Sequence, residues 1–130
     1  MSTPARILVV DDEPAISQIL QVGLERAGYT VETAADGQEG LMKARENKPD
    51  LILLDLMLPK LDGFKICRLL KFDERYRHIP IIILSARDQE RDKQLALETG
   101  ANLFLVKPQP LAALVAHVEA LLKASSEVGS

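Results

Sequence analysis

A chain of 130 residues with 47% apolar residues is long enough to form one domain with one packed core. Its formal charge is −3 and no basic stripe runs along it, so we expect no direct binding of nucleic acid. The single cysteine, Cys67, excludes an internal disulfide. The first apolar run, Ile7–Val10, is far too short for a signal peptide or a membrane span, so we expect a cytoplasmic protein without membrane contact.

The first predicted element is a strand, Ile7–Val10, whose unbroken apolar run is typical of a parallel strand covered on both faces. A helix should follow, because Pro14 suits a first helical turn and Gly28 suits a helix end. Between them, apolar or small residues recur at helical spacing: Ile16, Ile19, Leu20, Gly23, Leu24 and Ala27. The next segment, Thr30–Ala34, alternates and carries Glu32, so we expect an edge strand.

The middle of the chain continues this alternation of strands and helices. Leu41 and Ala44 weakly mark a helix, and Leu51–Leu54 predicts a second buried strand. Asp62 suits the cap of a third helix, and Ile81–Leu84 predicts the strand that follows it. The apolar residues of that third helix are Ile66, Leu69 and Leu70.

In the last third of the chain, Gln89–Thr99 predicts a mostly charged, thinly buried helix closed by Gly100, and Leu103–Val106 predicts a fifth strand. A final helix carries apolar residues at helical spacing: Leu111, Leu114, Val115, Val118, Leu121 and Leu122. Five β-α repeats predict an α/β domain of the flavodoxin-like, doubly wound (βα)5 type. We expect a five-stranded parallel sheet with strand order 2-1-3-4-5 and helices on both faces.

Polar residues stand where four of these strands end, and sheets of this type bind ligands at the carboxyl ends of their strands. They are Asp11, Asp12 and Glu13 after the first strand, Asp55 after the third, Ser85 after the fourth and Lys107 after the fifth. Asp55 is the most informative, because it interrupts the otherwise apolar run Leu51–Leu58 and burying an unpaired carboxylate is costly. The alternatives are a turn-capping role for Asp55 and helix capping by the acidic group after the first strand.

Three carboxylates at one edge of a sheet need positive charge beside them. Two carboxylates about 4 Å apart repel by roughly 1 kcal/mol in water and by about 4 kcal/mol at an effective dielectric near 20. Lys107 supplies one positive charge, and a hard divalent cation with oxygen ligands would supply two more. We therefore expect Mg²⁺ as the cofactor, with Mn²⁺ as an acceptable substitute.

These groups suit phosphoryl transfer. The carboxylate of Asp55 can attack phosphorus as a nucleophile. The Lys107 ammonium, the Ser85 hydroxyl and the cation can stabilise the negative charge that spreads over the equatorial oxygens in the transition state. Taken singly, Ser85 has the ordinary interpretation of a turn residue and Lys107 that of a solvated lysine. Their joint placement at the ends of the correct strands indicates a site.

Along Arg6–Lys123 the chain resembles the receiver (CheY-like) domain of two-component response regulators. Five stretches carry the resemblance, in order and at matching spacing: ILVVDDE (Ile7–Glu13), DLILLDLMLPKLDGF (Asp50–Phe64), PIIILSA (Pro80–Ala86), ETGA (Glu98–Ala101) and FLVKP (Phe104–Pro108). The resemblance implies a receiver domain over residues 1–123. The polar segment Ala124–Ser130 would then be a C-terminal tail or the start of a linker.

The resemblance also implies a role for individual residues. Asp55 would be the phosphoacceptor, assisted by Ser85 and Lys107. Mg²⁺ would be held by Asp11, Asp12, Asp55 and the backbone carbonyl of Met57. Ser85 and Phe104 would form a switch, in which Ser85 is drawn toward the phosphoryl group and Phe104 turns inward behind it. The Lys107–Pro108 peptide bond would be cis.

The implied function is a phosphorelay signalling switch and not an enzyme, although such a domain promotes its own phosphorylation and slow autodephosphorylation. A sensor histidine kinase or histidine phosphotransfer protein would donate the phosphoryl group. The face formed by Gln89–Thr99, Leu103–Val106 and Leu111–Lys123 would then bind a downstream target, an output domain or a second copy of the chain. The resemblance leaves open whether the receiver stands alone or belongs to a longer protein.

One departure from the family and two other function classes bear on this interpretation. Phe104 lacks the hydroxyl of the tyrosine common at its position, so its switch would depend on packing alone. A haloacid-dehalogenase-like phosphatase would carry Asp-x-Asp after the first strand, where this chain has adjacent aspartates. A nucleotide-binding protein would carry a glycine-rich phosphate loop there, and this chain has none.

Overall fold

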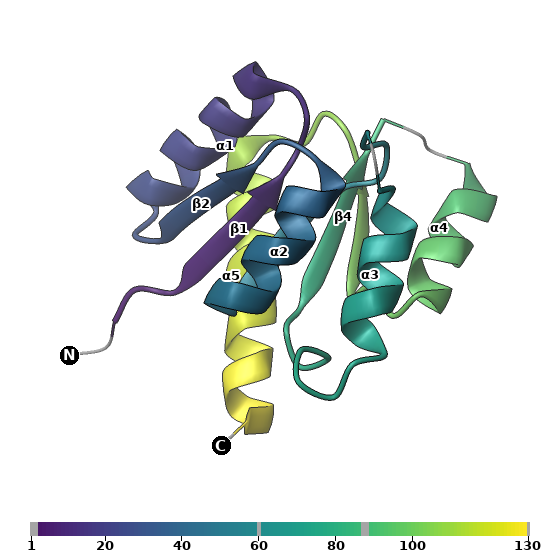
Figure 1. Ribbon diagram of the computed structural model, residues 1–130. Helices are drawn as coiled ribbons and strands as arrows, with labels where there is room; N and C mark the ends of the chain where they lie inside the picture. Colours follow the sequence, from purple (N-terminus) through teal and green to yellow (C-terminus); the bar gives the residue numbers. More distant parts are fainter. Residues whose placement is uncertain (1–2, 60, 87–88, 130) are drawn as a thin grey trace.

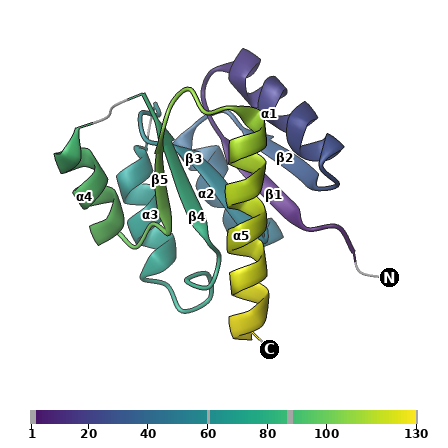
Figure 2. The same cartoon turned by 180° about the vertical axis from the view of Figure 1, so that it is seen from behind.

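The strands form one parallel sheet between two layers of helices (Figures 1 and 2). The computed structural model describes residues 3–59, 61–86 and 89–129. Its strands are β1 (Arg6–Val10), β2 (Thr30–Ala34), β3 (Leu51–Asp55), β4 (Ile81–Ser85) and β5 (Leu103–Val106). They pair in the order β2-β1-β3-β4-β5, with every neighbouring pair parallel. The predicted doubly wound fold and its strand order are confirmed.

The helices are α1 (Pro14–Arg26), α2 (Gly37–Asn47), α3 (Gly63–Lys71), α4 (Glu90–Glu98) and α5 (Leu111–Gly129). Figure 1 shows α2, α3 and α4 on the near face of the sheet, and Figure 2 shows α1 and α5 on the opposite face. Local signals set several ends: Pro14 opens α1, and the Asp62 side chain caps α3 by accepting the Lys65 N–H at 2.9 Å.

Helix α5 continues to Gly129, beyond the apolar spacing that predicted it, which ends at Leu122. Lys123, Ala124 and Glu127 are good helix formers and favour this extension. The role of residues 124–130 as a tail or as the start of a linker stays a prediction. Among the residues that the structure describes, no helix is both long and apolar enough to cross a membrane.

Two apolar clusters, one on each face of the sheet, explain why the inner strands are apolar without interruption. In β1, Leu8 and Val10 join the cluster beneath α2, α3 and α4, whereas Ile7 and Val9 join the cluster beneath α1 and α5. Residues of β3 alternate in the same way. Each fully buried aliphatic side chain contributes about 1.5–3 kcal/mol, so both layers hold the inner strands firmly in place.

Three large apolar residues that we assigned to helix faces lie on the surface. Ile19 of α1 is 60% exposed, and Leu69 of α3 and Leu111 of α5 are each 39% exposed. A helix that lies on a sheet buries a stripe little more than 100° wide, and a residue adjacent in sequence to the centre of that stripe points away from it. Leu20 and Leu70 occupy the stripe, so their neighbours Ile19 and Leu69 are left outside.

Candidate functional site

The carboxyl ends of the strands meet along the upper edge of the sheet in Figure 1. Asp55 and Ser85 are the last residues of β3 and β4, while Asp11 and Lys107 directly follow β1 and β5. Because β3 pairs with both β1 and β4, and β4 with β5, the topology brings these four positions to one edge. No single segment of the chain could do this, since Asp11 and Lys107 are 96 residues apart.

Three carboxylates lie together at this edge. Asp11, Asp12 and Asp55 each offer an oxygen, and these oxygens all lie within 4.8 Å of one another. Asp11 and Asp55 are 4% and 7% exposed, whereas Asp12 is open to solvent. Carboxylate oxygens are the ligands that Mg²⁺ prefers, and the open side leaves room for the waters that it keeps. The residues therefore fit Mg²⁺ or Mn²⁺.

Lys107 joins the two buried carboxylates. Its Nζ lies 2.8 Å from Oδ2 of Asp11 and 3.3 Å from Oδ2 of Asp55. Burial alone would lower the pKa of this ammonium, but its hydrogen bond to Asp11 and the charges of Asp55 and Asp11 raise the pKa above its ordinary value. Lys107 is therefore charged at neutral pH and balances part of the negative charge of the site.

Backbone amides hold the two buried carboxylates in place. The Met57 N–H donates to Oδ1 of Asp55 at 3.2 Å, and the Glu13 N–H donates to Oδ1 of Asp11 at 2.9 Å. Burial raises the pKa of Asp55, and the effect outweighs the opposing charge of Lys107 and the Met57 hydrogen bond. The fold thus holds Asp55 in a position where its negative charge is poorly solvated.

The Asp55→Asn variant should be more stable than the wild type in the absence of metal, by roughly 1 kcal/mol at pH 7, because a desolvated charge near Asp11 is removed. A carboxyl whose pKa is raised in the folded state destabilises the fold above that pKa, and this penalty disappears as the pH falls toward the ordinary value of 3.8. Urea unfolding in EDTA should therefore show the advantage of the variant shrinking as the pH falls through the raised pKa of Asp55 toward 3.8. An advantage that is constant down to pH 3 would contradict this explanation.

Ser85 and Phe104 lie behind the carboxylates. Ser85 is fully buried, and Phe104 is 7% exposed within the cluster beneath α2, α3 and α4. The switch that we expected, in which Phe104 turns inward behind Ser85, stays a prediction. A phenyl ring without a hydroxyl has no polar group to keep in water, which favours burial. The Lys107–Pro108 peptide bond is cis, as the resemblance implied.

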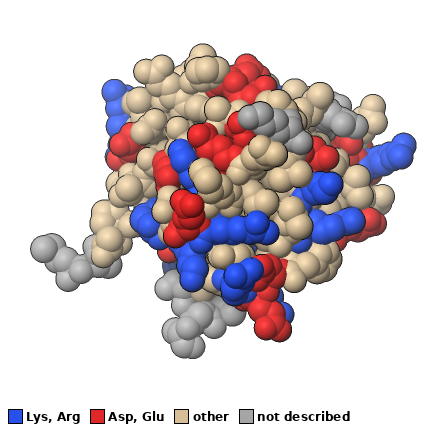
Figure 3. Space-filling model, viewed as in Figure 1, with Lys and Arg blue, Asp and Glu red and all other residues tan. Residues whose placement is uncertain are grey.

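Sequence reasoning did not find the backbone donors of Met57 and Glu13, because an amide N–H carries no residue-type signal. Figure 3 shows a group of acidic side chains toward the upper edge of the face that carries α2 and α3, whereas acidic and basic side chains are mixed over its middle and lower part.

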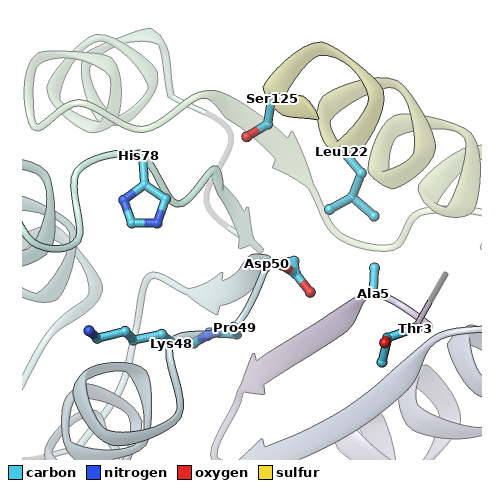
Figure 4. A pocket seen from close by; sticks show the side chains of 8 residues that line it. All are labelled: Thr3, Ala5, Lys48, Pro49, Asp50, His78, Leu122 and Ser125. Carbon is cyan, nitrogen blue, oxygen red and sulfur yellow. The ribbon is translucent and has the colours of Figure 1, made fainter. Parts of the chain in front are cut away.

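A recess of about 390 Å³ lies at the opposite end of the sheet (Figure 4). Residues that precede β1, β3 and β4 line it, among them Ala5, Asp50 and His78. The Asp50 carboxylate accepts the Arg6 N–H at 2.7 Å and so joins the starts of two strands. His78 is exposed. These groups are at the amino ends of the strands and cannot reach Asp55.

Known proteins are similar to this chain in sequence and in fold. A family model described as the response regulator receiver domain matches residues 7–119. The chain is 50% identical over 120 residues to the alkaline phosphatase synthesis transcriptional regulatory protein PhoP of Bacillus subtilis, covering 92% of this chain and 49% of that protein. It is 46% identical over 123 residues to the DNA-binding dual master transcriptional regulator RpaA of Synechocystis, covering 95% and 51%. The chain thus spans about half the length of these curated relatives.

Solved structures agree with the sequence comparisons. A CheY-like response regulator receiver domain protein from Methanospirillum hungatei superposes with a TM-score of 0.91 at 27% identity, covering 96% of this chain and 98% of that one. The receiver domain of a signal transduction histidine kinase from Syntrophus aciditrophicus superposes with a TM-score of 0.86 at 37% identity, covering 92% and 91%. Fold, site and sequence lead to one conclusion: the chain belongs to the receiver domain family of two-component response regulators.

Proposed function

We propose that Asp55 accepts a phosphoryl group from the phosphohistidine of a sensor histidine kinase or histidine phosphotransfer protein. The observation that carries the proposal is the placement of Lys107 between Asp11 and Asp55, at 2.8 and 3.3 Å, beside a third carboxylate. A purely structural ion pair needs one carboxylate per lysine. Three carboxylates around one ammonium leave an excess of negative charge, which suits a site completed by a cation.

In the proposed reaction, a carboxylate oxygen of Asp55 attacks phosphorus as the bond from phosphorus to the histidine nitrogen breaks, and the imidazole leaves with the electron pair. Lys107 needs only a small displacement from Asp55 to contact a phosphoryl oxygen. The Ser85 hydroxyl, at the end of the neighbouring strand, donates to a second oxygen. Water later hydrolyses the acyl phosphate and restores the carboxylate.

The proposed metal ligands are Asp11, Asp12, Asp55 and the backbone carbonyl of Met57. A bound Mg²⁺ or Mn²⁺ would supply positive charge to the phosphoryl oxygens. The residues themselves keep the acceptor oriented through the Met57 N–H and keep Asp11 oriented through the Glu13 N–H. The donor set, all oxygen and partly open to water, supports this choice of cation.

Phosphorylation would change the positions of Ser85 and Phe104, and through them the face formed by α4, β5 and α5. Since Phe104 is already buried, we propose that phosphorylation stabilises its inward position through Ser85, and so shifts an existing equilibrium. Exposed Leu97 of α4 supports this face as the one that binds an output domain, a target or a second copy. Sedimentation velocity with and without acetyl phosphate tests whether two copies of the chain pair. A chain that remains a monomer under both conditions would exclude pairing.

Intact mass after incubation with acetyl phosphate tests the proposed function directly. The wild type should gain the mass of one phosphoryl group when Mg²⁺ is present, and should gain almost none when EDTA removes it. Peptide mapping should place the group on the peptide that contains Asp55. An equal gain with EDTA would exclude a metal-dependent acceptor.

The phosphodonor should dock on the exposed face of α1. An apolar recess of about 250 Å³ beside Lys107 is lined by Ile16, Ile19, Leu84, Pro108 and Leu114, among others. Ile19→Asp places a charge in this recess on a residue that is 60% exposed, so the fold should tolerate it. We expect transfer from a phosphorylated histidine phosphotransfer protein to slow by about tenfold, with an unchanged rate from acetyl phosphate.

Leu97→Asp on α4 is the matched control, because Leu97 is 51% exposed and does not line this recess. It should leave the rates from both donors unchanged. Rapid-quench measurement of phosphoryl transfer gives both rates. If Ile19→Asp slows both donors equally, the effect acts on the site and the docking assignment is wrong.

A further inference from the structure

The first turn of α2 contacts both the end of β1 and the loop that follows β3. At residue 40, a Cβ atom would lie 2.7 Å from the side chain of Val10, the last residue of β1 before Asp11. At residue 37, a Cβ atom would lie 2.0 Å from the backbone oxygen of Leu61 and 2.7 Å from its Cβ. Because Gly40 has no Cβ atom, the turn packs closely on the strand that leads to Asp11. Because Gly37 has none, the turn also packs closely against the loop that follows Asp55.

The contact at Gly37 is with backbone. Its N–H donates a long hydrogen bond of 3.5 Å to the carbonyl of Pro59, which also accepts the Leu61 N–H at 2.8 Å. A backbone oxygen cannot rotate away as a flexible side chain can, so any atom added at residue 37 must displace either the helix or the loop.

The helix is the more firmly held of the two. The Asp36 side chain accepts the Glu39 N–H at 2.8 Å, and the Glu39 side chain accepts the Ala35 N–H at 2.7 Å. These two hydrogen bonds from backbone amides to side chains fix the start of α2, and Gly40 packs it closely on β1. An added atom at residue 37 should therefore move the loop and not the helix.

We infer that the first turn of α2 holds the loop after Asp55 in the position that metal binding requires, and we call this turn the brace. Gly37 is its positioning residue. The braced loop carries Met57, whose N–H orients Asp55 at 3.2 Å. The inference rests on the proposed metal-dependent function, in which the Met57 carbonyl is a ligand. Mg²⁺ requires near-ideal octahedral geometry, whereas Ca²⁺ tolerates longer and less regular bonds. Displacement of the loop should therefore weaken Mg²⁺ binding more than Ca²⁺ binding.

Gly37→Ala in the full chain tests the brace. Residue 37 does not have a left-handed φ, and alanine favours helices, so an unhindered change would stabilise the protein. We expect lower stability instead, together with about a tenfold loss of Mg²⁺ affinity and a smaller loss of Ca²⁺ affinity, measured by NMR titration of the unphosphorylated protein. Gly23→Ala is the control: its Cβ would lie 2.4 Å from the Leu111 side chain, at the contact of α1 with α5, and should leave Mg²⁺ affinity unchanged.

A second pair of variants tests the brace if Gly37→Ala does not fold. Glu39→Ala removes the acceptor for the Ala35 N–H, and Glu39→Gln keeps an acceptor while removing the same charge. The brace predicts weaker Mg²⁺ binding for Glu39→Ala than for Glu39→Gln. Equal Mg²⁺ affinities in the wild type and Gly37→Ala, or in the two Glu39 variants, would overturn the brace and leave the proposed function intact. Failure of the wild type to bind Mg²⁺ would overturn the proposed function itself.

Discussion

Asp55→Asn should abolish the phosphoryl mass gain that the wild type acquires from acetyl phosphate and Mg²⁺. An amide is a far weaker nucleophile than a carboxylate, so the acyl phosphate cannot form at this position. The neighbouring carboxylates should not replace it. Asp11 is held by the Glu13 N–H and by Lys107, and Asp12 is exposed to solvent, where its carboxylate is better hydrated than that of Asp55.

Asp50→Asn is the appropriate control, because Asp50 lies at the other end of β3 and is exposed. It should retain the full mass gain. Circular dichroism should show that both variants fold, and the stability expected for Asp55→Asn makes loss of folding an insufficient explanation. A mass gain retained in Asp55→Asn would show that another residue is the acceptor.

Lys107→Met should have the largest effect on stability. It keeps much of the side-chain volume but removes the ammonium that lies 2.8 Å from Asp11 and 3.3 Å from Asp55. Two carboxylates with side chains 3% and 8% exposed would then lack a counter-charge. Removing one partner of a buried pair costs about 3 kcal/mol, and we expect a loss of this size at pH 7 without metal.

The pH dependence of this loss has a defined sign. The pKa of Lys107 is raised in the folded state, so its contribution is complete below the ordinary value of 10.5 and is lost as the pH rises through the raised pKa. In the variant, the raised pKa of Asp55 lets the fold recover stability as the pH falls through that pKa. The difference between the wild type and Lys107→Met should therefore be largest near neutral pH and smaller at both extremes.

Urea unfolding in EDTA across the pH range measures this difference, and Lys93→Met on the exposed side of α4 serves as the control. The control should change stability by less than about 0.5 kcal/mol. Added Mg²⁺ should restore part of the stability of Lys107→Met, since it supplies positive charge to the same carboxylates. In the same variant, phosphorylation by acetyl phosphate should be about 100-fold slower. A difference independent of pH would indicate lost packing and not lost charge.

The fold and the location of the site were predictable from local patterns. Continuous apolar runs indicate strands covered on both faces, and the alternation of strands with helices leaves few topologies open. The structure has the predicted strand order, and Asp55 and Ser85 are the last residues of their strands. Convergence of the strand-end residues follows, because parallel strands end at one edge of a sheet.

Other features depended on distances that no local pattern contains. The spacing that marks an apolar helix face includes Ile19 and Leu69, and only the position of each helix on the sheet leaves them exposed. The burial of Phe104 depends on the apolar cluster beneath α2, α3 and α4, whose members come from distant parts of the chain. The extent of α5 to Gly129 could not be read from apolar spacing that stops at Leu122.

Residue types alone identify the groups at the strand ends: three carboxylates, a hydroxyl and an ammonium. Folding is needed to place Lys107 between Asp11 and Asp55, to orient Asp55 with the Met57 amide and to bring Gly37 against Leu61. Residue type specifies the chemistry that a side chain can perform, but not its neighbours. Distances between residues as far apart in sequence as Asp11 and Lys107 are set by the packing of the whole sheet and its helices.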